Sequence, residues 1–259
     1  MKTTLLAISS IIAVFGLAAP AAFGQAAATA ATPAPTNSPP WDVGASAGLT
    51  LTRGNSKTLL AVGKIIGDKK WDAGINELTL GADATYGQND VNGVTGTSAN
   101  QEHAFAQYNR LFTPRFYGYA RVDVLHDEIA DIDSRLTVGP GIGYYIIKET
   151  NTTFRGEAGG GYINEKDHND GTRSYETLRL AENFEHKFSA KARVWESVEI
   201  LPQVDKFSNY ILNSEIGVES ALTKKLSQQA YIQDCYHSDP APGRLKNDVK
   251  LVAAIAYKF

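Results

Sequence analysis

Apolar and polar residues alternate strictly at the end of the chain. Between Leu245 and Phe259 the odd positions are mostly apolar, whereas the even positions include Asp248, Lys250 and Lys258. Because successive side chains of a strand point to opposite faces, this pattern predicts one long strand with an apolar face and a charged face. An apolar row that ends on a terminal Phe is typical of a lipid-facing barrel strand.

The same alternation recurs after Trp41 in segments near the length that a tilted strand needs to cross a bilayer, about 9–11 residues. No helical period persists in this part of the chain. The sequence therefore predicts an all-β protein, a single antiparallel up-and-down transmembrane β-barrel of about 12 strands. The predicted strands are Asp42–Thr52, Lys57–Ile66, Ile75–Gly87, Gln101–Phe112, Arg115–Asp127, Ser134–Ile147, Thr152–Asn164, Arg173–Lys187, Lys191–Leu201, Asn209–Leu222, Leu226–His237 and Leu245–Phe259.

The predicted connections alternate in length. Odd connections such as Gln88–Asn100 and Glu165–Thr172 are long and polar, whereas even ones such as Thr113–Pro114 are short; the first hairpin, at Arg53–Ser56, is the exception. Outer-membrane barrels have short periplasmic turns and longer outer loops. This asymmetry predicts that both termini lie on the periplasmic side.

The N-terminal region has a different composition from the rest. Residues 1–24 combine an early Lys2 with an apolar run that ends at small residues, which predicts a cleaved signal peptide. Residues 25–40 are rich in Ala, Thr and Pro, which predicts an extended linker unable to bury a core. We therefore expect residues 41–259 to form the outer-membrane barrel.

Aromatic residues gather near the predicted periplasmic ends of the strands, where amphipathic rings favour the membrane interface. The alternative is that they are core aromatics of a soluble barrel. The predicted membrane-interface aromatics are Trp41, Phe112, Phe116, Phe188, Tyr257 and Phe259.

We expect the charged residues of the strands to lie on the inward rows, because exposing a charge to lipid has a high free-energy cost. If they line water, the barrel is a small passive diffusion pore whose charges set selectivity. If they pair across the lumen, it is a plugged structural or surface-binding barrel. The predicted lumen-lining residues are Glu77, Asp83, Arg121, Asp123, Arg135, Arg155, Glu157, Glu215, Glu219, Asp248, Lys250 and Lys258.

Composition narrows the choice of function. The formal net charge is -3, so the general basic footprint of a nucleic-acid-binding protein is missing. Cys235 is alone, which excludes an intramolecular disulfide. Beyond the N-terminus there is no run of apolar residues long enough for a membrane helix.

No enzymatic chemistry can be placed from the spacing. The five histidines show no zinc-ligand spacing, and the adjacent His237 and Ser238 would point to opposite faces of a strand. We predict no catalytic residue, no cofactor and no metal. Two acidic clusters, Asp127–Asp133 and Glu165–Asp170, are interpreted as solvated outer loops, with calcium or lipopolysaccharide-bridging ions as the alternative.

Four motifs in order along the chain resemble the domain of unknown function 481 family. They are the hairpin Thr52–Ser56, the run from Asp133 through Gly139-Pro140-Gly141 to Tyr144, the strand Glu157–Tyr162 and the closing Tyr257-Lys258-Phe259. The resemblance covers Trp41 to Phe259. Members are described as salt-induced outer membrane proteins, so it implies an outer-membrane barrel of unestablished role with no catalytic residues to carry over.

From this picture we expect export to the outer membrane, contact with its lipid and lipopolysaccharide, and insertion by the barrel-assembly machinery through the strand ending at Phe259. The sequence does not set the oligomeric state. Residues 173–201 fit poorly, because Glu176, Glu182 and His186 share a row with apolar residues. The rival interpretation is a soluble periplasmic β-barrel or sandwich that binds a ligand.

Overall fold

The computed structural model describes residues 41–52, 56–91, 94–167, 171–241 and 243–259. The predicted signal peptide (1–24), the predicted linker (25–40) and most of the first predicted hairpin lie outside these residues. No helix in the described part is long and apolar enough to cross a membrane.

Twelve strands and one 3-10 turn make up the barrel. In order they are β1 (Asp42–Thr52), β2 (Ser56–Trp71), η1 (Asp72–Gly74), β3 (Asn76–Val91), β4 (Val94–Leu111), β5 (Phe116–Asp127), β6 (Ile132–Lys148), β7 (Thr152–Asp167), β8 (Gly171–Ser189), β9 (Ala192–Pro202), β10 (Tyr210–Ala221), β11 (Leu226–His237) and β12 (Asn247–Lys258).

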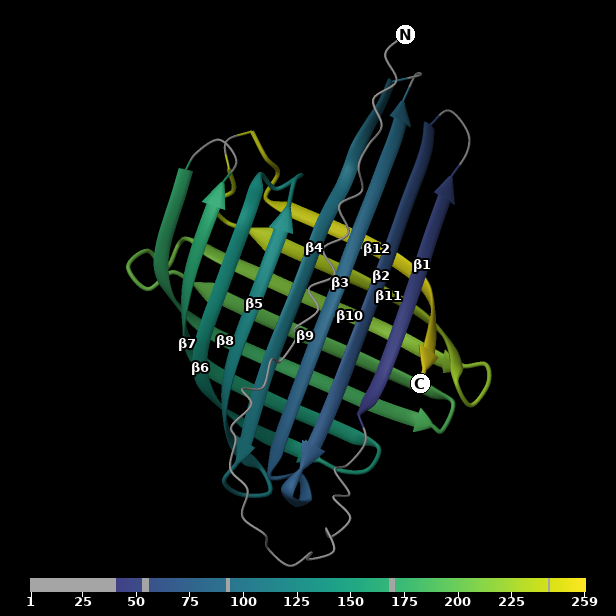
Figure 1. Cartoon of the computed structure of the whole chain (residues 1–259), viewed down its shortest axis with the longest axis vertical. Coiled ribbons are helices and arrows are strands. Elements are labelled where there is room, and N and C mark those ends of the chain that lie inside the picture. The colour runs from purple at the N-terminus through teal and green to yellow at the C-terminus, as the bar shows by residue number, and fades with distance from the viewer. Residues whose placement is uncertain (1–40, 53–55, 92–93, 168–170, 242) are drawn as a thin grey trace, which may run out of the picture. The chain divides into compact units, whose positions relative to one another are not determined.

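Each strand pairs antiparallel with its neighbours in the sequence, and β12 pairs with β1 to close the barrel (Figure 1). This confirms the predicted fold class. The closing seam is short, from Gly44↔Lys258 to Gly48↔Ala254. Strands of the near wall cross those of the far wall at a steep angle in Figure 1, as the tilt of barrel strands requires.

Side chains alternate between lumen and exterior along every wall. In β6 the inward Arg135 and Tyr145 are buried, whereas the outward Ile142, Tyr144 and Ile146 are about half exposed. The terminal strand follows its predicted pattern, with exposed apolar residues at odd positions. The exterior is therefore apolar and the interior polar, the reverse of a water-soluble core.

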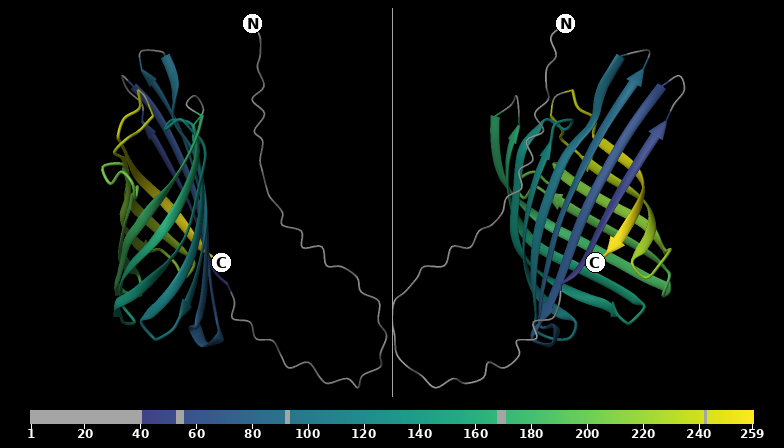
Figure 2. Two further views of the ribbon diagram at one scale, coloured as in Figure 1. Left: turned by 90° about the vertical axis from the view of Figure 1, so that its left-hand side faces the viewer. Right: turned by 45° about the vertical axis from the view of Figure 1, so that its right-hand side comes forward.

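The connections differ from the prediction. Residues 88–100, expected as a loop, are mostly strand, because β3 runs to Val91 and β4 starts at Val94. Likewise β7 runs to Asp167 and β8 starts at Gly171. These polar segments pair as strands beyond the apolar band, and both views in Figure 2 show the β3–β4 hairpin rising above the others.

The predicted length asymmetry is consequently wrong for most hairpins. Only the connections at 203–209 and 238–246 are long, and 92–93 and 168–170 are as short as the turns at the other end. The prediction took polar residues as a sign of loops. A hairpin that extends into water on both faces needs no apolar row, so its sequence looks like that of a polar loop. Both described ends of the chain lie together, since Phe259 N–H donates to Val43 O at 3.0 Å. We call this end of the barrel the terminal end.

Candidate functional site

The inward rows enclose a cavity of about 1470 Å³ to which all twelve strands contribute. Its lining runs from Lys225 and Lys258 at the terminal end to Asp248 and Lys250 near the opposite end. The lining is mixed in charge, with lysines and arginines beside carboxylates. This lumen is the candidate functional site of the barrel.

All of the predicted lumen residues lie on inward rows. Glu77 and Glu157 are buried against neighbouring strands. The others border the cavity itself: Asp83, Arg121, Asp123, Arg135, Arg155, Glu215, Glu219, Asp248, Lys250 and Lys258.

One side of the lumen, which we call the packed wall (β4 to β8), is organised around Glu157. Its carboxylate accepts hydrogen bonds from Arg179 Nη1 at 2.7 Å, Tyr117 Oη at 2.7 Å and Gln107 Nε2 at 3.0 Å. Arg179 Nε also donates to Glu199 Oε2 at 2.6 Å. The Glu157 side chain is only 1% exposed. These contacts hold several strands together and leave Glu157 no water-facing oxygen to offer a solute.

Glycines on β6 make room for the tyrosines of the packed wall. Tyr117 and Tyr119 of β5 lie directly across from Gly143 and Gly141. A Cβ atom at either glycine would overlap the opposite tyrosine ring. The rings therefore lie against the wall, and Tyr117 also packs on Tyr145 with ring centroids 5.4 Å apart. Pairing an aromatic ring with a facing glycine is a recurrent way to stabilise a strongly curved sheet.

The opposite side, which we call the open wall (β9 to β11), presents its charges to the cavity. Glu215 accepts from Trp195 Nε1 at 2.6 Å and Gln233 Nε2 at 2.8 Å, and it lies 3.4 Å from Lys64 Nζ. The Glu215 side chain is 16% exposed and that of Lys64 is 26% exposed. A second carboxylate, Glu219, is joined to Arg193 at 2.7 Å and is 21% exposed.

Two contacts reach from one side of the lumen to the other. Lys64 of β2 pairs with Glu215 of β10, and Lys250 of β12 donates to Gln101 of β4. Each joins strands that are not adjacent in the barrel. The cavity is therefore narrowed by side chains between these walls.

His103 links three consecutive strands on the cavity surface. Its Nδ1 lies 3.0 Å from Asp83 Oδ1 on β3, and its Nε2 lies 3.2 Å from Asp123 Oδ1 on β5. Arg121 also donates to Asp123 at 2.8 Å through Nε. Spacing along the sequence could not reveal this cluster, because its members meet only through the strand register.

The second predicted acidic loop is largely strand. Glu165 and Asp167 lie on β7, where Glu165 is fully buried and is bound by Arg135 and Arg173. The interpretation of these two residues as solvated loop carboxylates is wrong, because the strand continues and supplies basic partners. Among the described residues, no three His, Cys, Asp or Glu side chains are grouped as a metal site would require.

Several inward charges escaped the sequence analysis. Arg179 and Glu185 lie on the odd row of β8, and Arg193 and Glu199 lie on the odd row of β9. The signal was present, because Arg173, Tyr175, Thr177 and Arg179 form a polar row. It was hidden by the outward row of β8, in which charged residues interrupt the apolar ones. Lys64 was also missed.

The predicted interface aromatics all lie near the terminal end of the barrel. Phe112, Phe188 and Phe259 are more than 60% exposed. Phe112 and Phe116 are in contact with ring centroids 5.8 Å apart, as are Tyr257 and Phe259 at 5.0 Å. Trp41 precedes β1 at the same end.

The fold and the lumen together define a small, closed, twelve-stranded antiparallel barrel with an apolar exterior and a charged interior. A family model described as "Protein of unknown function, DUF481" matches residues 45–259. The chain belongs to this family. Among curated proteins, no sequence matches it.

Solved barrels resemble the chain in architecture. The NanC porin aligns with a TM-score of 0.52 and 6% identity, covering 84% of this chain and 100% of that one. An outer membrane channel from Pseudomonas putida F1 aligns with a TM-score of 0.49 and 10% identity, covering 85% and 94%. The KdgM porin gives 0.44 and 9%, covering 85% and 99%. At such low identity the likeness to NanC shows a shared fold.

Proposed function

We propose that the protein is an outer-membrane barrel that forms a narrow, water-filled pore for ions and small hydrophilic solutes. The observation that carries the proposal is the cavity of about 1470 Å³, lined by all twelve strands and by cations and carboxylates that remain partly exposed. Hydrated charges inside a closed barrel are the usual lining of a diffusion channel.

The exterior supports the membrane placement. Apolar side chains such as Ile142, Leu251 and Ile255 are at least half exposed. Exposed apolar surface of this extent is costly in water and favourable in lipid. The aromatic residues at the terminal end suit a membrane interface, which we assign to the periplasmic side. NanC, a solved barrel that shares the fold, is described as a porin.

The lumen charges set the expected selectivity. Cations and carboxylates are interspersed, so we expect weak selectivity rather than a strong preference for one sign. Glu215 and Glu219 face the cavity on the open wall. Their neutralisation should therefore move the selectivity toward anions.

A second candidate is a plugged structural or surface-binding barrel. The contacts that favour it are those across the lumen, from Lys64 to Glu215 and from Lys250 to Gln101. If these side chains exclude water from the narrow section, the barrel would be closed to solutes.

Recording from the refolded protein in a planar lipid bilayer distinguishes the two. A pore gives discrete, stable conductance steps that scale with salt concentration. A barrel that is folded and heat-modifiable on gels, yet electrically silent, would overturn the pore and leave the plugged barrel.

In the cell, we propose export by a signal peptide over residues 1–24, assembly through the strand ending at Phe259, and a role in salt or osmotic stress. Outer-membrane fractionation of cells expressing the full chain, with N-terminal sequencing of the mature protein, tests the first. Growth of a deletion strain at high salt tests the last.

A further inference from the structure

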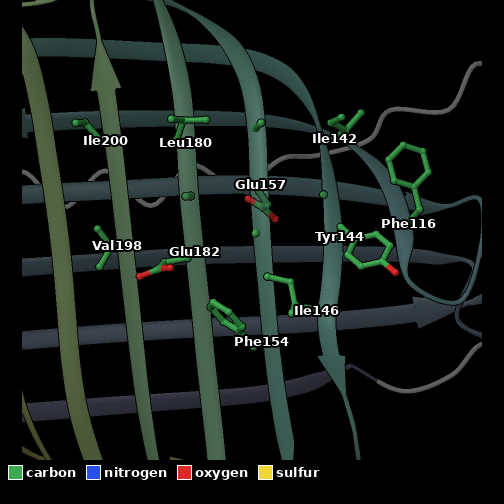
Figure 3. A pocket seen from close by; sticks show the side chains of 14 residues that line it. Phe116, Ile142, Tyr144, Ile146, Phe154, Glu157, Leu180, Glu182, Val198 and Ile200 are labelled. Atoms are coloured by element: carbon green, nitrogen blue, oxygen red, sulfur yellow. The ribbon is translucent and has the colours of Figure 1, made fainter.

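A groove on the exterior of the barrel extends from Phe116 of β5 across β6, β7 and β8 to Ile200 of β9. Its volume is about 480 Å³, within the roughly 300–1,000 Å³ common for ligand sites. The floor is formed by Gly156 and Ala158 of β7, and a Cβ at Gly156 would meet nothing within 4 Å. Larger apolar side chains border it on both sides, among them Ile142, Ile146, Phe154, Leu180, Val198 and Ile200 (Figure 3).

Glu182 is a carboxylate in the border of this apolar groove (Figure 3). It is exposed on the outward row of β8, directly across from Gly156 on β7. Within the described chain, no ion pair or side-chain hydrogen bond engages it. Glu157 also borders the groove, but its carboxylate is bound by Arg179, Tyr117 and Gln107 on the lumen side.

The strand register places Glu182 just inside a belt of aromatic residues. The next outward pair toward the terminal end is Phe154 and Phe184, with ring centroids 6.3 Å apart. Glu196 of β9 lies across from Phe184 and is also exposed. Two outward carboxylates therefore lie on neighbouring strands at the level where aromatic rings mark the edge of a bilayer.

An ionised carboxylate on a lipid-facing surface is costly unless a partner binds it, and such residues mark functional sites by default. The partner must bring donors and positive charge, and the groove must be filled by something apolar. A primary ammonium has three N–H donors, whereas a quaternary ammonium has none.

We propose that this groove is a phospholipid site, in which an acyl chain lies over Gly156 and Ala158 and a primary ammonium head group binds Glu182, with Glu196 beside it. The proposal rests on the membrane placement in the proposed function but not on conduction. A barrel that is silent in the bilayer can still hold the lipid, and a conducting barrel can lack it.

Native mass spectrometry of the full chain, released from detergent with equal amounts of three lipids of identical acyl chains, tests the site. We expect phosphatidylethanolamine to be retained over phosphatidylcholine and phosphatidylglycerol by roughly tenfold, as a charge-assisted hydrogen bond implies. Equal retention of the three lipids by the unaltered protein would overturn the proposal without any variant.

Variants separate the head-group contact from the groove. Glu182→Gln, alone or with Glu196→Gln, should abolish the preference, and Gly156→Leu should reduce retention of all three lipids. The matched controls are Glu176→Gln, on the outward row of β8 outside the groove, and Gly63→Leu, an exposed glycine of β2 with similar free space. A preference that survives the double Gln variant, or retention of all three lipids that Gly156→Leu leaves unchanged, contradicts the site. Heat modifiability confirms folding in each case.

Discussion

The packed wall and the open wall of the lumen contain the same kinds of charged side chain, but these side chains differ in their exposure and in their partners. Glu157 on the packed wall is 1% exposed and has three donors from three other strands. Glu215 on the open wall is 16% exposed, and its basic partner Lys64 reaches it across the cavity. One carboxylate is enclosed by protein, whereas the other borders the space through which a solute would move.

This difference predicts opposite roles for the two carboxylates. Removing one partner of an enclosed ion pair leaves an uncompensated charge, which is strongly destabilising. Removing a partner at a hydrated surface costs little, because water replaces it. The packed wall should therefore govern stability, and the open wall should govern what passes through the lumen.

The largest effect is expected from Glu157→Gln. Arg155 and Arg179 would lose the carboxylate that faces them, so the free energy of unfolding should fall by about 3 kcal/mol. Urea titration of the barrel in lipid vesicles measures it. The matched variant is Glu215→Gln, and an equal loss in both variants would show that the two walls do not differ.

The next effect concerns the glycine and tyrosine packing. Gly143→Ala places a methyl group against the ring of Tyr117, and overpacking of this kind costs about 1–3 kcal/mol. Gly160→Ala is the control, because a Cβ there meets nothing within 4 Å. If both variants unfold at the same urea concentration, the packing of the Tyr117 ring against Gly143 does not contribute to the stability of the strand pair.

A smaller effect is expected for Glu215→Gln. Gln can still accept from Trp195, and Lys64 can be hydrated in the cavity, so the unfolding free energy should change by about 1 kcal/mol or less. A loss approaching that of Glu157→Gln would place Glu215 among the structural residues.

The smallest effect is expected for an ion pair between two loops. Lys206 donates to Asp239 at 2.8 Å and holds the pKa of that carboxyl below its ordinary value of 3.8. Both side chains are more than half exposed, so Lys206→Ala should cost less than about 1 kcal/mol. Because folding lowers this pKa, the ion pair stabilises the folded state at neutral pH. That stabilisation is lost as the pH falls below about 3.8 and through the folded-state pKa.

Urea titrations of the unaltered protein and of Lys206→Ala at neutral and acid pH test this pH dependence of the unfolding free energy. The two curves should converge as the pH falls. A gap that widens on acidification would contradict the assignment.

How much the sequence reveals depends on how strict the alternation is. In β12 the exposed Val249, Leu251 and Ile255 and the inward Asp248 and Lys250 follow from the pattern alone. In β8 the outward row contains Glu182, which hid the polar row that includes Arg179. A charged residue on the outward row of a strand thus makes the polar inward row of the same strand harder to detect in the sequence.

The contacts inside the lumen could not be predicted in the same way. Gly141 and Gly143 are visible as glycines, but the tyrosines over them come from β5 and are set by the register. Lys64 and Glu215 are 151 residues apart and meet only because the barrel closes. Long polar hairpins were taken for loops, because pairing beyond the apolar band leaves no alternation to detect.

The most direct test compares the reversal potentials of Glu215→Gln and Glu157→Gln with that of the unaltered protein under a KCl gradient. The two substitutions remove the same charge from the open wall and the packed wall. We predict that Glu215→Gln shifts selectivity toward anions, whereas Glu157→Gln shifts it clearly less wherever that variant remains folded. A shift in Glu157→Gln equal to or larger than that in Glu215→Gln would contradict the division between the two walls.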